Sequence, residues 1–358
     1  MKTTLIACFM LLGSTALASD YSYRSTLDAT SARGGLNTSD AVLLTPQAGR
    51  GAGSASYQYF TRYRTSAGAI TTSGAYRVRE MADRVRYIGD GWILEALGDG
   101  SAVRYRNMAY LNRAAQEGYS LERQMTNDDL DRAGRAFIAS DLSESVRLGT
   151  NETLVTFESS YIIQEVQDDT DRSDVTQTLG ANMVAFSRTV NGQAVVGKGS
   201  KVAVIFAADG VAAGFDFDWP AYAQSTQRQS VYDIESINTR ASRVLPVDPY
   251  GTDSRLERTE CGYYDAGARR RHTTTPIQTA CFYHYSVAQI DEPGSPDPHL
   301  GGTRAGYAYA VPAGVTVQPD SGWPLAMLLC TDGTGCGSMP RGSPPPYDPI
   351  LGSTRSDD

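Results

Sequence analysis

Two aspartates in the middle of the chain have a spacing that paired acid–base catalysts use. Asp216 and Asp218 alternate with Phe215, Phe217 and Trp219. Successive side chains of a strand point to opposite faces, so both carboxylates would leave the same face. Paired carboxylates act as general acid and base when their environments drive their pKa values apart. The alternation is equally typical of the wet face of a half-buried sheet, and we favour that interpretation.

One histidine is placed where it could act as a base. His284 lies between Tyr283 and Tyr285, three residues beyond Cys281. A histidine within hydrogen-bond reach of a substrate proton is the commonest general base. The Gly-x-Ser-x-Gly elbow of many hydrolases is absent from the sequence. We therefore expect a structural histidine on a strand and no catalytic residue; the sequence leaves open whether the protein is an enzyme and favours that it is not.

An acidic stretch has part of the spacing of a calcium loop. Asp169, Asp171 and Ser173 match its opening positions. Asp174 stands where the loop needs glycine, and Gly180 stands where it needs the bidentate glutamate. A solvated acidic loop is favoured over an irregular calcium site, so no metal is expected.

A glycine-rich stretch resembles a phosphate-binding loop. Gly192 and Gly197 are followed by Lys198, but Gly199 stands where a serine or threonine must hold magnesium. That motif also needs a helix after it, whereas strand-like residues lie on both sides here. We expect a hairpin at this place and no cofactor.

Tyrosine is the most abundant aromatic residue, with 21 copies against nine Phe and three Trp. Its rigid ring with a polar tip suits contacts with peptides, proteins or carbohydrates. Tyrosine also favours strands, which gives a purely structural explanation. The candidate binding residues are Tyr283, Tyr285, Tyr307 and Tyr309, together with the Asn191-Gly192 turn.

The N-terminus is typical of a secretion signal. Lys2 precedes an apolar stretch over residues 5–12, and Ala16-Leu17-Ala18 fits a small-x-small cleavage site. We expect a signal peptide over residues 1–18 and a secreted or periplasmic protein. No later segment is long and apolar enough to span a bilayer, so no transmembrane segment is expected. The net charge of −8 disfavours a nucleic-acid partner.

Four cysteines remain once the signal has been removed. An even number in an exported chain predicts two disulfides. Pairing of sequence neighbours, Cys261–Cys281 and Cys330–Cys336, is the simplest of three connectivities. Neither pair has the spacing of zinc ligands.

Two helices are predicted, each followed by strands. Thr126 and Asp129 begin the first helix with a capping box, and Leu130, Phe137 and Ile138 share its buried face. Asn191-Gly192 and the later Asp-Gly pair at 209–210 predict hairpin turns. The second helix is predicted to start after Ser230 and Asp233 and to end before Pro246, with Ile234, Ile237, Ala241 and Val244 on one face.

These elements predict an α+β fold of two helix-on-antiparallel-sheet modules. We expect a flexible leader over 19–55 and a first module over 56–224 that begins with a β-rich part. A second module with a disulfide would span 225–329. The Gly- and Pro-rich tail over 330–358 is expected to be disordered.

Residues 126–220 resemble a PepSY-type or thermolysin-propeptide-type domain, which has a cystatin-like fold. The residues that carry this resemblance are the stretch 190–202, Val-Asn-Gly-Gln-Ala-Val-Val-Gly-Lys-Gly-Ser-Lys-Val, and the closing turn Ala208-Asp209-Gly210. Such domains are usually exported and often chaperone or inhibit proteases. No protease domain follows, and the His-Glu-x-x-His zinc motif is absent.

The sequence thus favours a secreted, non-enzymatic protein that binds a protein or peptide, in its sharpest form an inhibitor or chaperone of an exported protease. An exposed sheet edge or a hairpin tip would make the contact. One alternative is a secreted hydrolase that uses the carboxylates or His284. Another is a carbohydrate-binding surface protein that uses the tyrosines.

Overall fold

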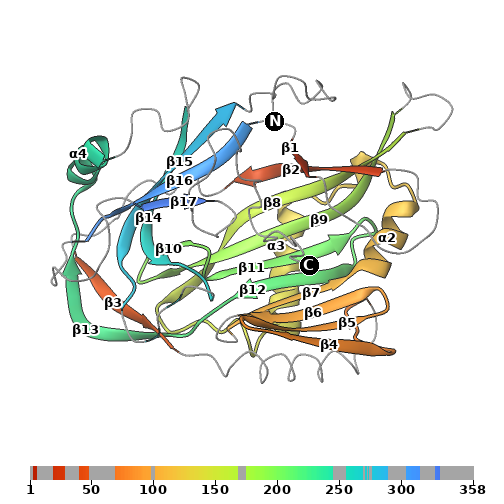
Figure 1. Ribbon diagram of the computed structural model, residues 1–358, viewed down its shortest axis with the longest axis horizontal. Coiled ribbons are helices and arrows are strands. Elements are labelled where there is room, and N and C mark those ends of the chain that lie inside the picture. Colours follow the sequence, from red (N-terminus) through yellow and green to blue (C-terminus); the bar gives the residue numbers. More distant parts are fainter. Residues whose placement is uncertain are drawn as a thin grey trace.

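The computed structural model contains a large sheet that extends across both expected modules (Figure 1). It describes residues 3–5, 19–28, 40–47, 69–97, 101–167, 175–244, 255–268, 271, 273, 276–288, 304–314 and 327–330. Strands greatly outnumber helices in these residues. The prediction of two separate helix-on-sheet modules is therefore wrong, because strands from the two halves of the chain pair with each other.

The larger part of the sheet is antiparallel throughout. In spatial order its strands are β2 (Ser19–Asp28), β8 (Glu152–Gln167), β9 (Val175–Val190), β11 (Lys201–Ala207), β12 (Ala212–Asp218), β7 (Ala102–Asn107), β6 (Trp92–Leu97), β5 (Arg84–Gly89) and β4 (Tyr76–Met81). A short strand β1 (Thr3–Leu5) pairs with β2. In the described part of the chain, β4 is the last strand at its end of the sheet.

A short strand joins this part to the second half of the chain. β10 (Gln193–Gly197) pairs with the end of β9 and then runs parallel to β14 (Arg255–Asp265). Beyond β14 the sheet continues with β15 (Thr279–Ala288), β16 (Arg304–Pro312) and β17 (Met327–Cys330). The backbone hydrogen bonds of β10 thus fuse the two halves that the sequence suggested were independent.

The turns were predicted well. Asn191 and Gly192 both have positive φ, 51° and 78°, which is the conformation of a type I′ hairpin. Gly210, with φ 84°, turns the chain between β11 and β12. The Gly-rich stretch that begins at Gly192 contains strand β10 and does not form a strand-to-helix loop. The predicted hairpin at this place is thereby confirmed.

Helix α3 (Asn127–Asp141) covers one face of the sheet, as Figure 1 shows. The side chain of Thr126 accepts a hydrogen bond from the N–H of Asp129, so the predicted cap is confirmed. Leu130, Phe137 and Ile138 are buried in the main core, which also contains the inward-facing aromatic residues of β7 and β12. Helix α2 (Met108–Gln116) and the 3-10 turn η2 (Leu121–Arg123) precede α3.

Helix α4 (Ile234–Val244) confirms the second predicted helix. The N–H of Ser236 donates to Asp233 Oδ1 at its start. Ile237 and Ala241 pack in a small core with Cys261, Cys281, Tyr283 and Val311, whereas Ile234 is 39% exposed. The strands beneath α4 belong to the fused sheet.

The segment expected to be a flexible leader contains two strands. β2 pairs with β8 over most of its length. β3 (Asp40–Pro46) pairs with β13 (Tyr222–Ser230) as a separate two-stranded ribbon. β2 is mostly polar, and β3, which buries Ala41 and Leu44, pairs with a strand from a distant part of the chain, so the local sequence did not reveal either strand. Residues 331–358 of the expected tail lie outside the described residues.

Candidate functional site

The two aspartates of β12 lie on one face, as predicted, but that face is not wet. Their side chains are only 12% and 16% exposed, and each is paired with an arginine. Asp216 Oδ2 lies 2.9 Å from Arg104 Nε, and Asp218 is paired with Arg271. The expectation of a solvated face was wrong because arginines from other elements cover both carboxylates.

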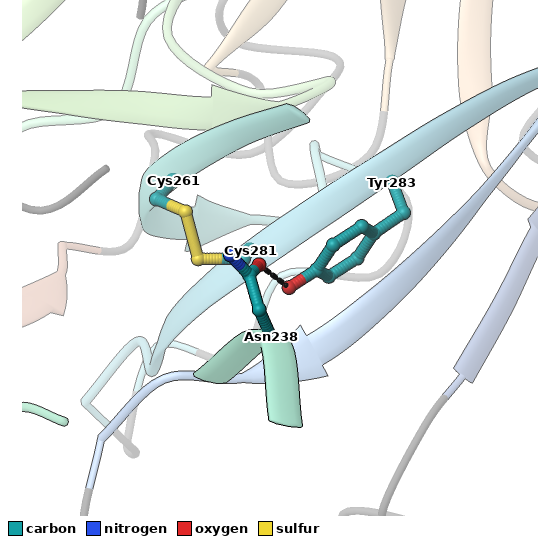
Figure 2. The surroundings of a disulfide bond; sticks show 4 residues. All are labelled: Asn238, Cys261, Cys281 and Tyr283. Carbon is teal, nitrogen blue, oxygen red and sulfur yellow. Dashed lines mark hydrogen bonds between the residues drawn. A yellow bond between two sulfur atoms is a disulfide. The ribbon is translucent and has the colours of Figure 1, made fainter. Parts of the chain in front are cut away.

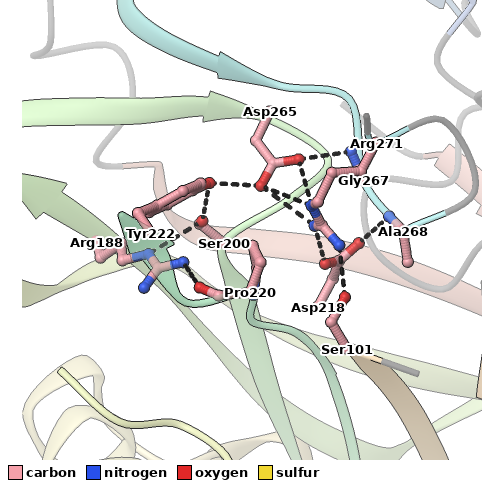
Figure 3. Close-up of polar contacts among 10 residues, drawn as sticks. All are labelled: Ser101, Arg188, Ser200, Asp218, Pro220, Tyr222, Asp265, Gly267, Ala268 and Arg271. Carbon is pink, nitrogen blue, oxygen red and sulfur yellow. Dashed lines mark hydrogen bonds and ion pairs between the residues drawn. The ribbon is translucent and has the colours of Figure 1, made fainter. Parts of the chain in front are cut away.

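Asp218 belongs to an interior polar cluster, shown in Figure 3. Its members are Ser101, Arg188, Ser200, Asp218, Tyr222, Asp265 and Arg271. The guanidinium of Arg271 lies between the carboxylates of Asp218 and Asp265 and also donates to Ser101. Arg271 and Asp265 have fully buried side chains.

The interior polar cluster extends from Asp265 to Arg188 on β9. Tyr222 donates its hydroxyl hydrogen to Asp265, and Ser200 Oγ lies 2.9 Å from the Tyr222 oxygen. Arg188 Nε donates to Ser200 Oγ at 3.0 Å. The Arg188 guanidinium also pairs with Glu152 at 2.9 Å and lies against the rings of Trp219 and Tyr222.

Burial controls the protonation of this cluster. It raises the pKa of Asp218 to about 6, because loss of solvent and the nearby charge of Asp265 outweigh the attraction of Arg271. Burial and the charge of Asp265 also hold the pKa of Tyr222 well above its ordinary value, so the phenol stays a donor. Burial disfavours the charge of Arg271, but the two aspartates outweigh it and raise the pKa of the guanidinium.

The geometry of the interior polar cluster is that of a structural connection. Asp218 ends β12 and Asp265 ends β14, so Arg271 ties the two parts of the sheet together. The carboxylates and hydroxyls are the residue types of hydrolase sites, but here they are buried and bonded to one another. The structure also keeps His284 apart from Asp216 and Asp218, because β15 is separated from β12 by β14, β10, β9 and β11.

The predicted tyrosines occupy opposite register positions on two paired strands, β15 and β16. Tyr283 is opposite Tyr309, and Tyr285 is opposite Tyr307. Tyr283 is buried and donates its hydroxyl hydrogen to Asn238 Oδ1 of α4 at 2.8 Å (Figure 2). This tyrosine therefore holds α4 on the sheet.

The disulfide Cys261–Cys281 joins directly opposite residues of β14 and β15 (Figure 2). Cys330 lies on β17, and Cys336 lies outside the described residues. The acidic stretch over 168–174 also lies outside them. Among the residues the structure does describe, no group of three or more metal-ligating side chains occurs.

The Asn191-Gly192 tip is exposed but is braced by its neighbours. The Asn191 side chain donates to Gln224 Oε1 at 3.3 Å, and its backbone N–H donates to the carbonyl of Asn151 at 2.8 Å. A tip held in this way is less suited to insertion into a partner than a free loop is.

A more open surface lies at the far end of the sheet, on β4. Residues 76–80 are all exposed, and Val78 and Tyr76 are 48% and 39% exposed. β4 pairs with β5 on one side, and no described strand pairs with its other side. Such an edge leaves a row of backbone N–H and C=O groups available to another chain.

One face of this edge carries arginines in register. Arg79, Arg86, Glu95, Arg104 and Asp216 are directly opposite one another across five neighbouring strands. We define the arginine face as Arg77, Arg79, Arg84, Arg86, Arg104 and Arg106, which share this side of the sheet.

Carboxylates pair with the inner members of the arginine face, and Arg84 is also paired with Asp83 at 2.9 Å. Glu95 pairs with Arg86 at 2.5 Å and lies 3.7 Å from Arg84. Asp216 pairs with Arg104 and lies 3.6 Å from Arg106. Arg77 and Arg79, on the outermost strand, make no ion pair with any described residue and are exposed.

The other face of the edge carries Tyr76, Val78 and Glu80, and it is apolar except for Glu80 at its end. The Tyr76 ring lies 5.9 Å from the ring of Tyr87 and 6.4 Å from that of Trp92, both of which belong to the main core. Val78 extends this apolar surface to the rim of the sheet. The edge therefore presents arginines on one side and aromatic and aliphatic groups on the other.

The arginine face was not predicted, although the sequence contains a signal for it. Arginine recurs at every second position in three of the described strands, as Arg77 and Arg79 in β4, Arg84 and Arg86 in β5, and Arg104 and Arg106 in β7. In a strand this spacing puts both members on one face.

Comparisons with known proteins add no assignment. No family model matches the sequence, and no curated protein matches it. Among solved structures, an uncharacterized protein from Eubacterium rectale ATCC 33656 is similar with a TM-score of 0.44 and 9% identity, covering 78% of this chain and 87% of that one. No helix of the described residues is long and apolar enough to cross a membrane.

Proposed function

We propose that this protein binds an extended segment of another protein by adding it as a strand to β4. The observation that carries the proposal is the exposure of this edge. All of residues 76–80 are exposed, and β4 has an open side among the described strands. Addition of a strand to such an edge is a recurring mode of peptide recognition.

The backbone groups available for this pairing follow from the register of the hairpin. A two-residue loop closes β4 and β5 with Met81 opposite Arg84. Two-residue hairpins close on a hydrogen-bonded pair, and bonded and non-bonded pairs alternate along an antiparallel ladder. We therefore expect Val78 and Glu80 to turn their N–H and C=O groups away from β5 and towards a partner.

The edge is also rigid enough to bind without reorganisation. β5 and β6 hold β4 in the sheet, and Tyr76 packs beside core residues on the neighbouring strands. A preformed edge spares a partner part of the entropy cost of ordering two flexible segments. Inhibition or chaperoning of an exported protease remains a finer prediction, in which the bound segment would belong to that protease.

A displayed library of random peptides, selected on the full chain, tests the proposal. We expect selected peptides to lose at least about tenfold in affinity for Val78→Pro, because proline lacks the N–H that a new strand needs. Val78→Thr, which keeps that donor and suits a strand, should bind them normally. Thermal unfolding of both variants checks that the fold is retained. Recovery of no peptide, or of peptides that bind Val78→Pro as well as wild type, would refute strand addition at β4.

A further inference from the structure

We infer that the segment bound by β4 is acidic and that its acidic residues alternate with apolar ones. This inference rests on the proposed strand addition at β4 and names the chemistry of the partner. It follows from the arginine face on one side of the edge and from Tyr76 and Val78 on the other.

The arginine face is a local positive surface on a protein whose formal net charge is −8. Each of its four inner arginines lies within 4 Å of a carboxylate oxygen, which belongs to Glu95, to Asp216 or to the turn residue Asp83. Arg77 and Arg79, at the rim, have no ion-pair partner among the described residues, so theirs are the charges open to a partner. A guanidinium recognises a carboxylate through a planar pair of hydrogen bonds, which makes an acidic side chain the best match.

The register shows that a carboxylate is needed beside Arg79. Arg79 is directly opposite Arg86, and like charges directly opposite each other destabilise a pair of strands. Arg86 is relieved by Glu95 on its other side. A carboxylate on a strand added beside β4 would offset the charge of Arg79 in the same way.

The same charges act against a second copy of this chain. Pairing of two β4 strands would bring the outer arginines of both copies together at an edge, where charged side chains oppose self-association. An acidic strand suffers no such repulsion. Charge complementarity thus favours an acidic partner over a copy of this chain.

The alternating pattern follows from the pleat of the strand. Side chains of an added strand would point alternately to the two faces of the sheet. Those on the side of Arg77 and Arg79 would be acidic. Those on the opposite side would contact Tyr76 and Val78 and would be apolar or aromatic.

Labelled peptides titrated with the full chain test the inference by fluorescence polarisation. The three probes alternate valine with glutamate, glutamine or lysine, and each is first shown to be monomeric. We expect the glutamate peptide to bind at least about tenfold more tightly than the glutamine peptide, as expected for about two cross-strand charge pairs. The lysine peptide should bind most weakly.

A double charge reversal on β4 tests the same contact from the side of the protein. Arg77→Glu with Arg79→Glu should weaken binding of the glutamate peptide about tenfold and should strengthen binding of the lysine peptide. Arg123→Glu with Arg132→Glu changes the net charge by the same amount at exposed positions of η2 and α3. This control should bind all three peptides as wild type does.

The outcomes separate the inference from the proposed function. Equal binding of the glutamate and glutamine peptides, lost in Val78→Pro, would overturn the acidic preference and leave strand addition intact. Binding of the glutamate peptide that survives Val78→Pro would overturn both, as would failure of all three peptides to bind. A dimer in light scattering that Val78→Pro dissociates would identify a second copy as the occupant and would overturn the inference alone.

Discussion

Asp218 should give this protein a measurable dependence of stability on pH. Burial raises the pKa of its carboxyl to about 6 in the folded chain, against 3.8 for the unperturbed group. The folded protein therefore holds this proton more tightly than the unfolded chain does. The stabilisation that protonation provides is complete below pH 3.8 and is lost as the pH rises through about 6.

The magnitude follows from the two pKa values. The difference between them corresponds to a maximum contribution of about 3 kcal/mol to the free energy of unfolding. About 1 kcal/mol of this is lost between about pH 5 and about pH 7, where the folded group ionises. The Asp218 side chain is only 16% exposed, so solvent screens little of this effect.

Urea unfolding at about pH 5 and about pH 7, at constant ionic strength, measures this loss. Tryptophan fluorescence provides a signal, since Trp219 lies against Arg188 of the interior polar cluster. Asp218→Asn mimics the protonated side chain and does not titrate. Between the two pH values, wild type should lose about 1 kcal/mol more than this variant.

Asp131→Asn is the matched control. Burial of Asp131 favours a higher pKa, but hydrogen bonds from Arg135 and Thr156 outweigh it and lower the pKa of this carboxyl. Its contribution is therefore present at neutral pH and is lost only as the pH falls below the range of the assay. Asp131→Asn should follow the wild-type pH dependence. If Asp218→Asn also follows it, the assignment of the raised pKa is refuted.

Two further substitutions test the core and the disulfide. Gly134→Ala should destabilise the protein by about 1–3 kcal/mol, although alanine is the better helix former by about 1 kcal/mol. A Cβ at this position would lie 2.6 Å from Val184 and 2.7 Å from Phe186, so urea unfolding that shows greater stability would contradict the packing. Cys261→Ser with Cys281→Ser should cost about 3 kcal/mol, because the bond closes a loop with a sequence separation of 20. Reductant should lower the melting temperature of wild type and leave that of the double variant unchanged.

Local features of this fold were predictable from the sequence because their causes are local. The cap at Thr126 and the buried residues of α3 depend on side chains within a few turns of one helix. The Asn191-Gly192 turn depends on two residues that tolerate positive φ. The disulfide between Cys261 and Cys281 follows from cysteines that are neighbours in the sequence.

The fusion of the sheet depends on contacts that no local pattern records. β10 pairs with β14, and Val195 of the first half is thereby placed opposite Tyr263 of the second. Nothing in the alternation of either strand identifies the other as its partner. The ion pairs of Asp216 and Asp218 were missed for the same reason, because Arg104 and Arg271 come from distant parts of the chain.

The arginine face could be recognised as a candidate binding site only from the register of the strands. Arginine at every second position is evident in the sequence, but its meaning depends on what lies opposite each residue. Glu95 and Asp216 supply a carboxylate to every inner strand of the arginine face. Arg79 is the one member of the in-register row whose next neighbour would belong to a strand beyond β4. A partner strand that supplies a carboxylate at this position would offset the charge of Arg79 as Glu95 offsets that of Arg86.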